Sequence, residues 1–215
     1  AWMQPNHILA LLYDYIVETR GWKMPAARSV ATSHLMDAVA RHYGAKVFQT
    51  PVGFKYIGEL IQQDKIAMGG EESAGMTVRG HVPEKDGILA CLLVAEMVAA
   101  RRAPLAEQLR ALFKCVGGEF WPLRTNMHLP EDVKLKTVDR LKSDFSTFLG
   151  RRVKSLDRTD GLKFEFAGGS WVLLRLSGTE PLLRIYPEAA TLQESSKLAE
   201  ETKSWVMVSA QEAKA

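Results

Sequence analysis

The chain has 215 residues, of which 47% are hydrophobic and 25% are charged. This is the composition of an ordinary globular protein with one large or two small domains, and it excludes a disordered or fibrous chain. The net charge of +3 is well short of the basic surface of a nucleic-acid-binding protein, and no apolar run is long enough to cross a membrane. We therefore expect neither nucleic acid nor membrane as a partner.

The first part of the chain alternates helical and strand-like segments. Apolar residues recur at helical spacing after Pro5, which predicts an amphipathic helix that stops near Gly21. Ser33 is expected to cap the next helix. The expected helices cover residues 5–20, 34–43, 54–63, 86–102 and 105–116, and the expected strands cover 28–32, 46–49 and 66–68. Alternating helices and strands with short connections predict a three-layer α/β domain.

The pattern changes after the glycine pair Gly117-Gly118. Residues 120–129 have the pattern of a strand, and Pro130 is expected to open a helix whose apolar positions continue to Leu149. Further strands are expected at 153–156, 162–166, 171–176 and 183–186, and a closing helix at 192–208. Strands grouped between two helices predict a smaller α+β domain, so we divide the chain into residues 1–117 and 118–215.

The two cysteines, Cys91 and Cys115, lie in apolar stretches with a helical pattern. Buried free thiols in a reducing compartment are expected rather than a disulfide or a metal site.

The segment from Arg175 to Arg184 joins two strand-like stretches and reads Arg-Leu-Ser-Gly-Thr-Glu-Pro-Leu-Leu-Arg. A phosphate dianion needs charge-assisted donors from several directions, and guanidinium groups, hydroxyls and backbone N–H groups supply them. Glu180 would then pair with an arginine. A solvated hairpin tip explains the same composition equally well, so composition alone does not decide between the two.

Two further segments place charged groups at the ends of expected elements. Residues 69–75, Gly-Gly-Glu-Glu-Ser-Ala-Gly, follow a short strand, and spacing alone favours a plain acidic turn. Residues 79–87 bring basic groups to a helix start, where the macrodipole is positive; a capped helix start with solvated charges is the alternative.

The segment from Arg175 to Arg184 resembles the phosphate-binding loop in the last domain of the α-D-phosphohexomutases, which include phosphoglucomutases and phosphomannomutases. The resemblance implies that Arg175, Ser177, Gly178 (through its N–H) and Thr179 grip the phosphate that is not transferred. Arg184 is a further candidate, although it can equally stabilise the loop.

Residues 69–75, which we call the acidic loop, resemble the sugar-binding loop of domain 3 in the same family. Glu71 and Ser73 inherit contacts with hydroxyls of the sugar ring, and the Glu-Glu-Ser form with Glu72 is similar to that of glucose-preferring members. Some relatives carry a histidine soon after the serine, but here Ala74 and Gly75 occupy those places.

Candidates for proton transfer follow from two more resemblances. The stretch from Arg79 to Gly87 resembles the family segment that brings a lysine and a histidine to the active site, and these correspond to Lys85 and His81. Residues 52–55 resemble a motif whose lysine, here Lys55, approaches the catalytic phosphoserine. We expect Asp86 to be a helix cap.

The resemblance covers nearly the whole chain, as domains 3 and 4. It implies an α/β three-layer domain followed by a smaller α+β domain, a sheet packed with helices of the TATA-box-binding-protein type. The implied reaction interconverts hexose 1-phosphate and hexose 6-phosphate, with glucose favoured over mannose, through a phosphoserine and a bisphosphorylated intermediate, in the cytoplasm.

The serine and the Mg²⁺ loop of the family belong to domains 1 and 2. The sequence contains neither an Asp-x-Asp-x-Asp pattern nor a convincing serine motif, because Leu35-Met36 follow Thr32-Ser33-His34 where Asn-Pro is expected. We therefore expect domains 1 and 2 of a longer chain as partners, with Mg²⁺ held there, glucose 1,6-bisphosphate as intermediate or activator, no metal ligand in this chain, and an inert isolated chain. The alternative is a non-catalytic module that binds sugar phosphates.

Overall fold

The computed structural model describes residues 3–177 and 182–212. The chain divides into two compact units, Ala1–Phe120 and Trp121–Ala215, whereas the predicted boundary lies between residues 117 and 118. Gly117 has a local role near this boundary: it adopts a left-handed conformation, with φ of 75°, and ends a helix by donating its N–H to the carbonyl of Phe113.

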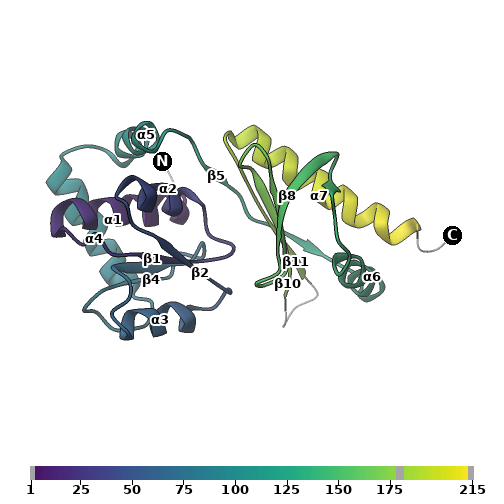
Figure 1. Cartoon of the computed structure of the whole chain (residues 1–215), viewed down its shortest axis with the longest axis horizontal. Coiled ribbons are helices and arrows are strands. Elements are labelled where there is room, and N and C mark those ends of the chain that lie inside the picture. Colours follow the sequence, from purple (N-terminus) through teal and green to yellow (C-terminus); the bar gives the residue numbers. More distant parts are fainter. Residues whose placement is uncertain (1–2, 178–181, 213–215) are drawn as a thin grey trace. The chain divides into compact units, whose positions relative to one another are not determined.

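The first unit contains a mixed sheet with helices on both of its faces. Its elements are α1 (Pro5–Arg20), β1 (Ala26–Ser29), α2 (Leu35–His42), β2 (Val47–Thr50), α3 (Phe54–Gln62), β3 (Met68–Gly70), β4 (Met76–Val78), α4 (Gly87–Arg101) and α5 (Leu105–Val116). The strand order is β2-β1-β3-β4; β1 is parallel to β2 and β3, and β4 returns antiparallel to β3. In Figure 1, α1 and α2 lie on one side of this sheet and α3 on the other.

The first helix is buried on nearly all sides, so the predicted amphipathic helix is wrong in character although α1 spans the expected residues. Pro5 opens the helix, and Gly21, with φ of 63°, ends it. Neighbouring helices α2, α4 and α5 pack against it, and even Asn6 and His7 are buried. A helix enclosed in this way has no solvated face to mark its orientation.

The second unit is an antiparallel sheet covered by helices. Its elements are β5 (Trp121–Pro122), β6 (Thr125–His128), α6 (Glu131–Leu141), β7 (Thr147–Phe148), β8 (Arg151–Asp157), β9 (Leu162–Phe166), β10 (Trp171–Leu176), β11 (Leu182–Ala189) and α7 (Leu192–Glu212). The strand order is β5-β11-β10-β9-β8-β7, and β6 also pairs with β11. Together the two units confirm the predicted fold class.

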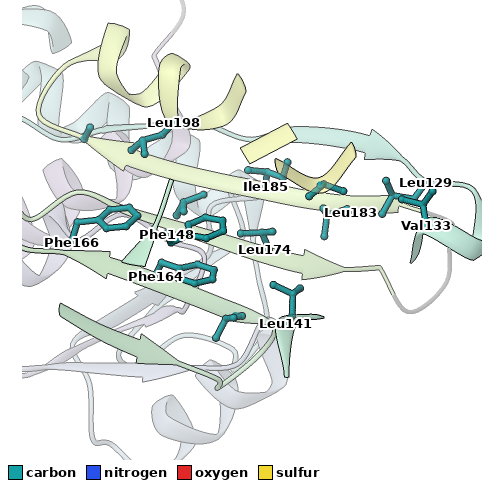
Figure 2. Packing of buried hydrophobic residues seen from close by; sticks show 14 residues of the cluster. Leu129, Val133, Leu141, Phe148, Phe164, Phe166, Leu174, Leu183, Ile185 and Leu198 are labelled. Atoms are coloured by element: carbon teal, nitrogen blue, oxygen red, sulfur yellow. The ribbon is translucent and has the colours of Figure 1, made fainter. Parts of the chain in front are cut away.

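Alternate residues of the central strands form the core of the second unit. Phe164, Leu174 and Ile185 come from β9, β10 and β11 and lie in one apolar cluster with Phe148 (Figure 2). The intervening residues point to the other face of the sheet, because side chains alternate along a strand. That face carries Trp171, whose indole N–H donates to Glu188 at 2.7 Å, and it also carries the arginines of the expected phosphate loop.

Several predicted elements differ from the structure. The expected helix from Pro130 to Leu149 ends at Leu141, because Arg158 donates to the carbonyl oxygens of Leu141 and Ser143 and so satisfies the helix end. The single strand expected at 120–129 is two strands, β5 and β6, and β4 was not predicted. Both cysteines are exposed, so the expectation of buried thiols is wrong: in α4 only Leu93 and Met97 are buried.

Candidate functional site

Three segments with chemical groups follow the parallel strands of the first unit. The strands β1, β2 and β3 run in the same direction, so their carboxyl ends meet at one edge of the sheet. In open α/β sheets this edge is where ligands bind. The segments are Val30–His34 after β1, Pro51–Gly53 after β2 and Glu71–Gly75 after β3.

Glu71 joins two of these segments. Its side chain is buried, with 6% of the residue exposed, and its Oε1 accepts a hydrogen bond from the backbone N–H of Gly53 at 2.8 Å. Gly53 directly precedes α3, so the carboxylate lies at the positive end of that helix. Glu71, which is expected to contact the sugar, therefore also fixes the start of α3, the helix that carries Lys55.

Glu72 joins the same loop to the end of β1. Its Oε2 accepts from the hydroxyl of Ser29 at 3.2 Å, and its backbone N–H donates to Thr32 Oγ1 at 3.1 Å. The sequence analysis assigned no contact to Glu72 and so missed this role. No signal in the local spacing reveals it, because the contact joins residues 40 or more positions apart.

The acidic loop is the turn of a hairpin between β3 and β4. The N–H of Glu71 donates to Gly75 at 2.9 Å, the N–H of Ala74 donates back to Glu71 at 3.0 Å, and Ser73 lies exposed at the tip. Gly70 packs so closely on α1 that a Cβ there would lie 2.4 Å from a methyl group of Leu9. The base of the loop is thus clamped, while its tip is open to solvent.

Lys85 lies beside both the acidic loop and the start of α3. Its aliphatic stem packs against Gly75, where a Cβ would approach Lys85 Cδ to 3.2 Å, and its ammonium group lies 5.5 Å from the ring centre of Phe54. The backbone supports this position, because the N–H of Asp86 donates to the carbonyl of Met76 at 3.1 Å. Lys85 also pairs with Glu84 at 3.2 Å, and both side chains are largely exposed.

His81 has a structural partner. Its Nε2 lies 2.9 Å from the carboxylate of Asp86, which caps α4 by accepting from the N–H groups of Ile88 and Leu89. The N–H of Leu89, and after it the imidazole of His81, hold the pKa of Asp86 below its usual range. The expected cap is therefore confirmed, and the structure ties His81 to that cap.

The other basic residues of this unit differ in their surroundings. Lys55 is exposed on the first turn of α3, with its ammonium group 4.8 Å from the ring centre of Tyr56. Arg79 forms a two-pronged ion pair with Asp64 and stacks near Trp22. The positive charge of Arg79 is offset by Asp64. Of the two predicted lysines, Lys85 packs against the acidic loop at Gly75, and Lys55 lies on the first turn of α3, the helix whose start Glu71 holds.

The expected phosphate loop connects β10 and β11 in the second unit. Arg175 and Arg184 are direct cross-strand partners, so both side chains leave the same face of the sheet. At the base of the loop, the N–H of Ser177 donates to the carbonyl of Leu182 at 2.8 Å, and Ser177 is buried. Gly178 and Thr179 lie outside the described residues.

Like charges on directly opposed residues destabilise a pair of strands. An anion between Arg175 and Arg184 would relieve this repulsion, because guanidinium groups donate charge-assisted hydrogen bonds to anions. The arrangement can therefore bind a phosphate group.

The described ranges, 3–177 and 182–212, contain no group of three or more His, Cys, Asp or Glu residues that could hold a metal ion. No helix within the same ranges has the length and apolar character needed to cross a bilayer.

Comparisons with known proteins agree over both units. Residues 4–116 match phosphoglucomutase/phosphomannomutase, alpha/beta/alpha domain III, and residues 125–204 match the C-terminal domain of the same family. The phosphoglucomutase/phosphomannomutase of Thermococcus kodakarensis is 28% identical over 198 residues, covering 92% of this chain and 41% of that protein. The phosphoglucomutase of Rhizobium radiobacter is 31% identical over 183 residues, covering 75% of this chain and 34% of that protein.

A solved structure gives the same result. The open form of parafusin, a phosphoglucomutase from Paramecium, has a TM-score of 0.75 and 25% identity, covering 98% of this chain and 42% of that protein. The chain thus spans well under half the length of the relatives that it matches. It belongs to the phosphoglucomutase/phosphomannomutase family, of which it contains the alpha/beta/alpha domain III and the C-terminal domain.

Proposed function

We propose that this chain is the sugar- and phosphate-recognition part of an enzyme that interconverts hexose 1-phosphate and hexose 6-phosphate, with glucose as the preferred sugar. The observation that carries the proposal is the opposed pair Arg175 and Arg184 at the base of the loop from Ser177 to Leu182. Two guanidinium groups on one face suit a phosphate dianion, which accepts several charge-assisted hydrogen bonds.

The carboxyl edge of the first unit supports sugar recognition. Glu71 offers a carboxylate whose Oε1 is already fixed by Gly53, and Ser73 offers an exposed hydroxyl at the tip of the same hairpin. Fixed acceptors and donors of this kind recognise sugar hydroxyls without first having to be ordered. In this proposal the first unit recognises the ring and the second unit grips the phosphate that is not transferred.

For proton transfer we propose Lys85 before Lys55 and His81. Lys85 lies beside the acidic loop, whereas the imidazole of His81 is engaged by the cap of α4. Lys55 lies on the first turn of α3, and we propose that it contacts the transferring phosphate. Positioning and charge stabilisation dominate phosphoryl transfer, so both lysines would also help to hold and neutralise the reacting oxygens.

The transferable phosphate and Mg²⁺ are proposed to come from further domains of a longer chain. The described residues offer no cluster of ligands for a metal, so we assign none of them to Mg²⁺. In the two half-reactions the bisphosphorylated sugar, glucose 1,6-bisphosphate, must be recognised in both orientations. A clamp for the distant phosphate that is separate from the hydroxyl ligands would meet that requirement.

Calorimetric titration of the isolated chain tests the proposal. Glucose 1-phosphate and glucose 6-phosphate are expected to bind, glucose alone is expected to bind far more weakly, and the bound sugar phosphates are expected to remain unconverted. Absence of any binding by either sugar phosphate would overturn the assignment. Conversion of one into the other by the isolated chain would overturn the requirement for further domains.

A further inference from the structure

The β8–β9 turn brings an unassigned carboxylate to the phosphate loop. Asp160 lies in this turn, and its Oδ2 accepts the Nε–H of Arg175 at 2.8 Å. Both side chains are mostly buried, with 25% of the aspartate and 18% of the arginine side chain exposed. Sequence analysis assigned the pairing carboxylate to Glu180, which lies outside the described residues.

We propose that Asp160 is a positioning residue that orients the guanidinium of Arg175 for the phosphate group of the substrate. This inference rests on the proposed function. A guanidinium has five N–H donors in a planar fork, and Asp160 takes the one on Nε. The terminal nitrogens of Arg175 make no hydrogen bond within the part of the chain that the structure describes, so their four donors remain available for two-pronged binding of a phosphate.

The turn that carries Asp160 is held against β10. Gly161 has φ of 94°, and a Cβ there would lie 2.4 Å from the carbonyl oxygen of Leu174 and 3.3 Å from Arg175 Cβ. No side chain fits in that space, and L residues rarely adopt that backbone conformation. Glycine at position 161 thus allows the turn to approach β10 closely enough for the carboxylate of the preceding residue, Asp160, to reach Nε of Arg175.

The same turn is fixed from two other directions. Arg158 donates to the carbonyl oxygens of Leu141 and Ser143 at 2.7 Å each, which ties the turn to the end of α6. Asp157 Oδ1 accepts from the N–H and the hydroxyl of Thr159, which closes the turn internally. A carboxylate on a surface loop would otherwise sample many positions, whereas these contacts hold the turn where Asp160 meets Nε of Arg175.

The balance of charges indicates that Asp160 positions Arg175 rather than blocking the binding of a phosphate. Arg175 and Arg184 repel each other across the two strands, and Asp160 offsets part of that repulsion when no ligand is bound. The three groups together keep a net positive charge, so the attraction for a phosphate dianion remains. Because Asp160 meets Nε, it does not compete for the terminal donors.

The test compares Asp160→Ala and Asp160→Asn with the unaltered chain, using inorganic phosphate, glucose 6-phosphate and glucose as probes. Asp132→Asn is the matched control, because it removes a negative charge from an exposed residue in the first turn of α6. Asp160→Ala is expected to lower the affinity for inorganic phosphate and for glucose 6-phosphate by about 10-fold, which is the size of effect that follows the loss of a hydrogen bond to a charged group. The asparagine variant retains an oxygen that can accept from Nε, so its loss should be smaller, and Asp132→Asn should match the unaltered chain.

The Nε–Hε signal of Arg175 in ¹⁵N NMR reports the contact itself. It should move and exchange faster with water in Asp160→Ala, and it should stay near its original position in Asp132→Asn. An unmoved signal, or unchanged or tighter phosphate binding in Asp160→Ala, would overturn the inference while leaving the proposed function intact. If Asp160→Ala does not fold, Asp160→Asn decides by the same two readouts. An unaltered chain that binds none of the phosphate-bearing probes would overturn the proposed function and this inference with it.

Discussion

The backbone N–H of Gly53 donates to the buried carboxylate of Glu71 at 2.8 Å, so the residue expected to read the sugar also holds the start of α3. Glu71→Gln retains an oxygen that can accept this hydrogen bond, whereas Glu71→Ala leaves the N–H of Gly53 without it. We expect the alanine variant to lose about 1–3 kcal/mol of unfolding free energy and the glutamine variant to lose much less.

Binding should separate the two roles of the loop. Glu71→Gln and Ser73→Ala are both expected to weaken the binding of glucose 6-phosphate without affecting the binding of inorganic phosphate, because Glu71 and Ser73 are assigned to the hydroxyls of the sugar ring. Ser73→Ala should leave stability unchanged, since Ser73 is exposed. Calorimetry with both ligands and thermal unfolding of each variant check this; equal weakening of both ligands would contradict the assignment.

Gly58 in α3 locks the segment that carries Lys85. A Cβ at Gly58 would lie 2.3 Å from the carbonyl oxygen of Pro83. Gly58→Ala should therefore displace residues 81–86 and destabilise the first unit by about 1–3 kcal/mol, even though alanine favours helices. Gly87→Ala, at a helical position with nothing within 4 Å, is the matched control and should be neutral or slightly stabilising. Hydrogen exchange across residues 79–87 would detect the difference, and equal protection in the two variants would contradict it.

The charge state of His7 should make the first unit sensitive to acid. Burial lowers the pKa of His7 below its usual 6.5, and its Nε2–H donates to the carbonyl of Phe120 at 2.8 Å. Below about pH 6.5, His7 is protonated in the unfolded chain but stays neutral in the folded chain. The contribution of His7 to stability is therefore present above about pH 6.5 and is lost as the pH falls. The slope is at most about 1.4 kcal/mol per pH unit.

Hydrogen exchange of α1 at about pH 7 and about pH 5 measures this dependence. His7→Gln should flatten the acid-side loss of protection, while His128→Gln, at an exposed histidine of β6, should not. If His7→Gln loses as much protection between these two pH values as the unaltered chain does, the acid sensitivity belongs to other groups.

In a longer chain that also contains the first two domains, Lys85→Met should lower turnover of glucose 1-phosphate far more than it raises KM. This split is expected because a proton donor acts in the transition state rather than in ground-state binding. His81→Gln should cost mainly stability through the cap of α4. Full turnover by Lys85→Met over the whole pH range would transfer the role to His81 or Lys55.

Sequence reasoning located elements best where turn residues bracket a regular pattern. The expected bounds of α5, β9 and β10 agree with the structure, because proline or glycine residues flank clear periodicity in each. It failed where the deciding contact comes from elsewhere in the chain. Residues 142–149 contain no early stop signal, and α6 ends where Arg158, 17 positions beyond Leu141, satisfies its last carbonyls.

The site shows the same division. The loop containing Glu71 and the arginines of the phosphate loop were identified by motif. Their supporting partners were not, since Gly53 meets Glu71 only through the parallel sheet, and Asp160 meets Arg175 only through the close approach of a neighbouring turn. Such pairs depend on sheet register, which the spacing of one segment cannot supply.

The central claim is that one class of ligand, a hexose phosphate, is read through its sugar by the first unit and through its phosphate by the second. Chemical-shift mapping of the chain with glucose 6-phosphate and with inorganic phosphate tests it directly. Inorganic phosphate should shift the signals of Arg175, Ser177 and Arg184 but not those of Glu71 to Ser73, and glucose 6-phosphate should shift both sets of signals. Signals of Arg175 and Ser177 that respond to neither ligand would contradict the account.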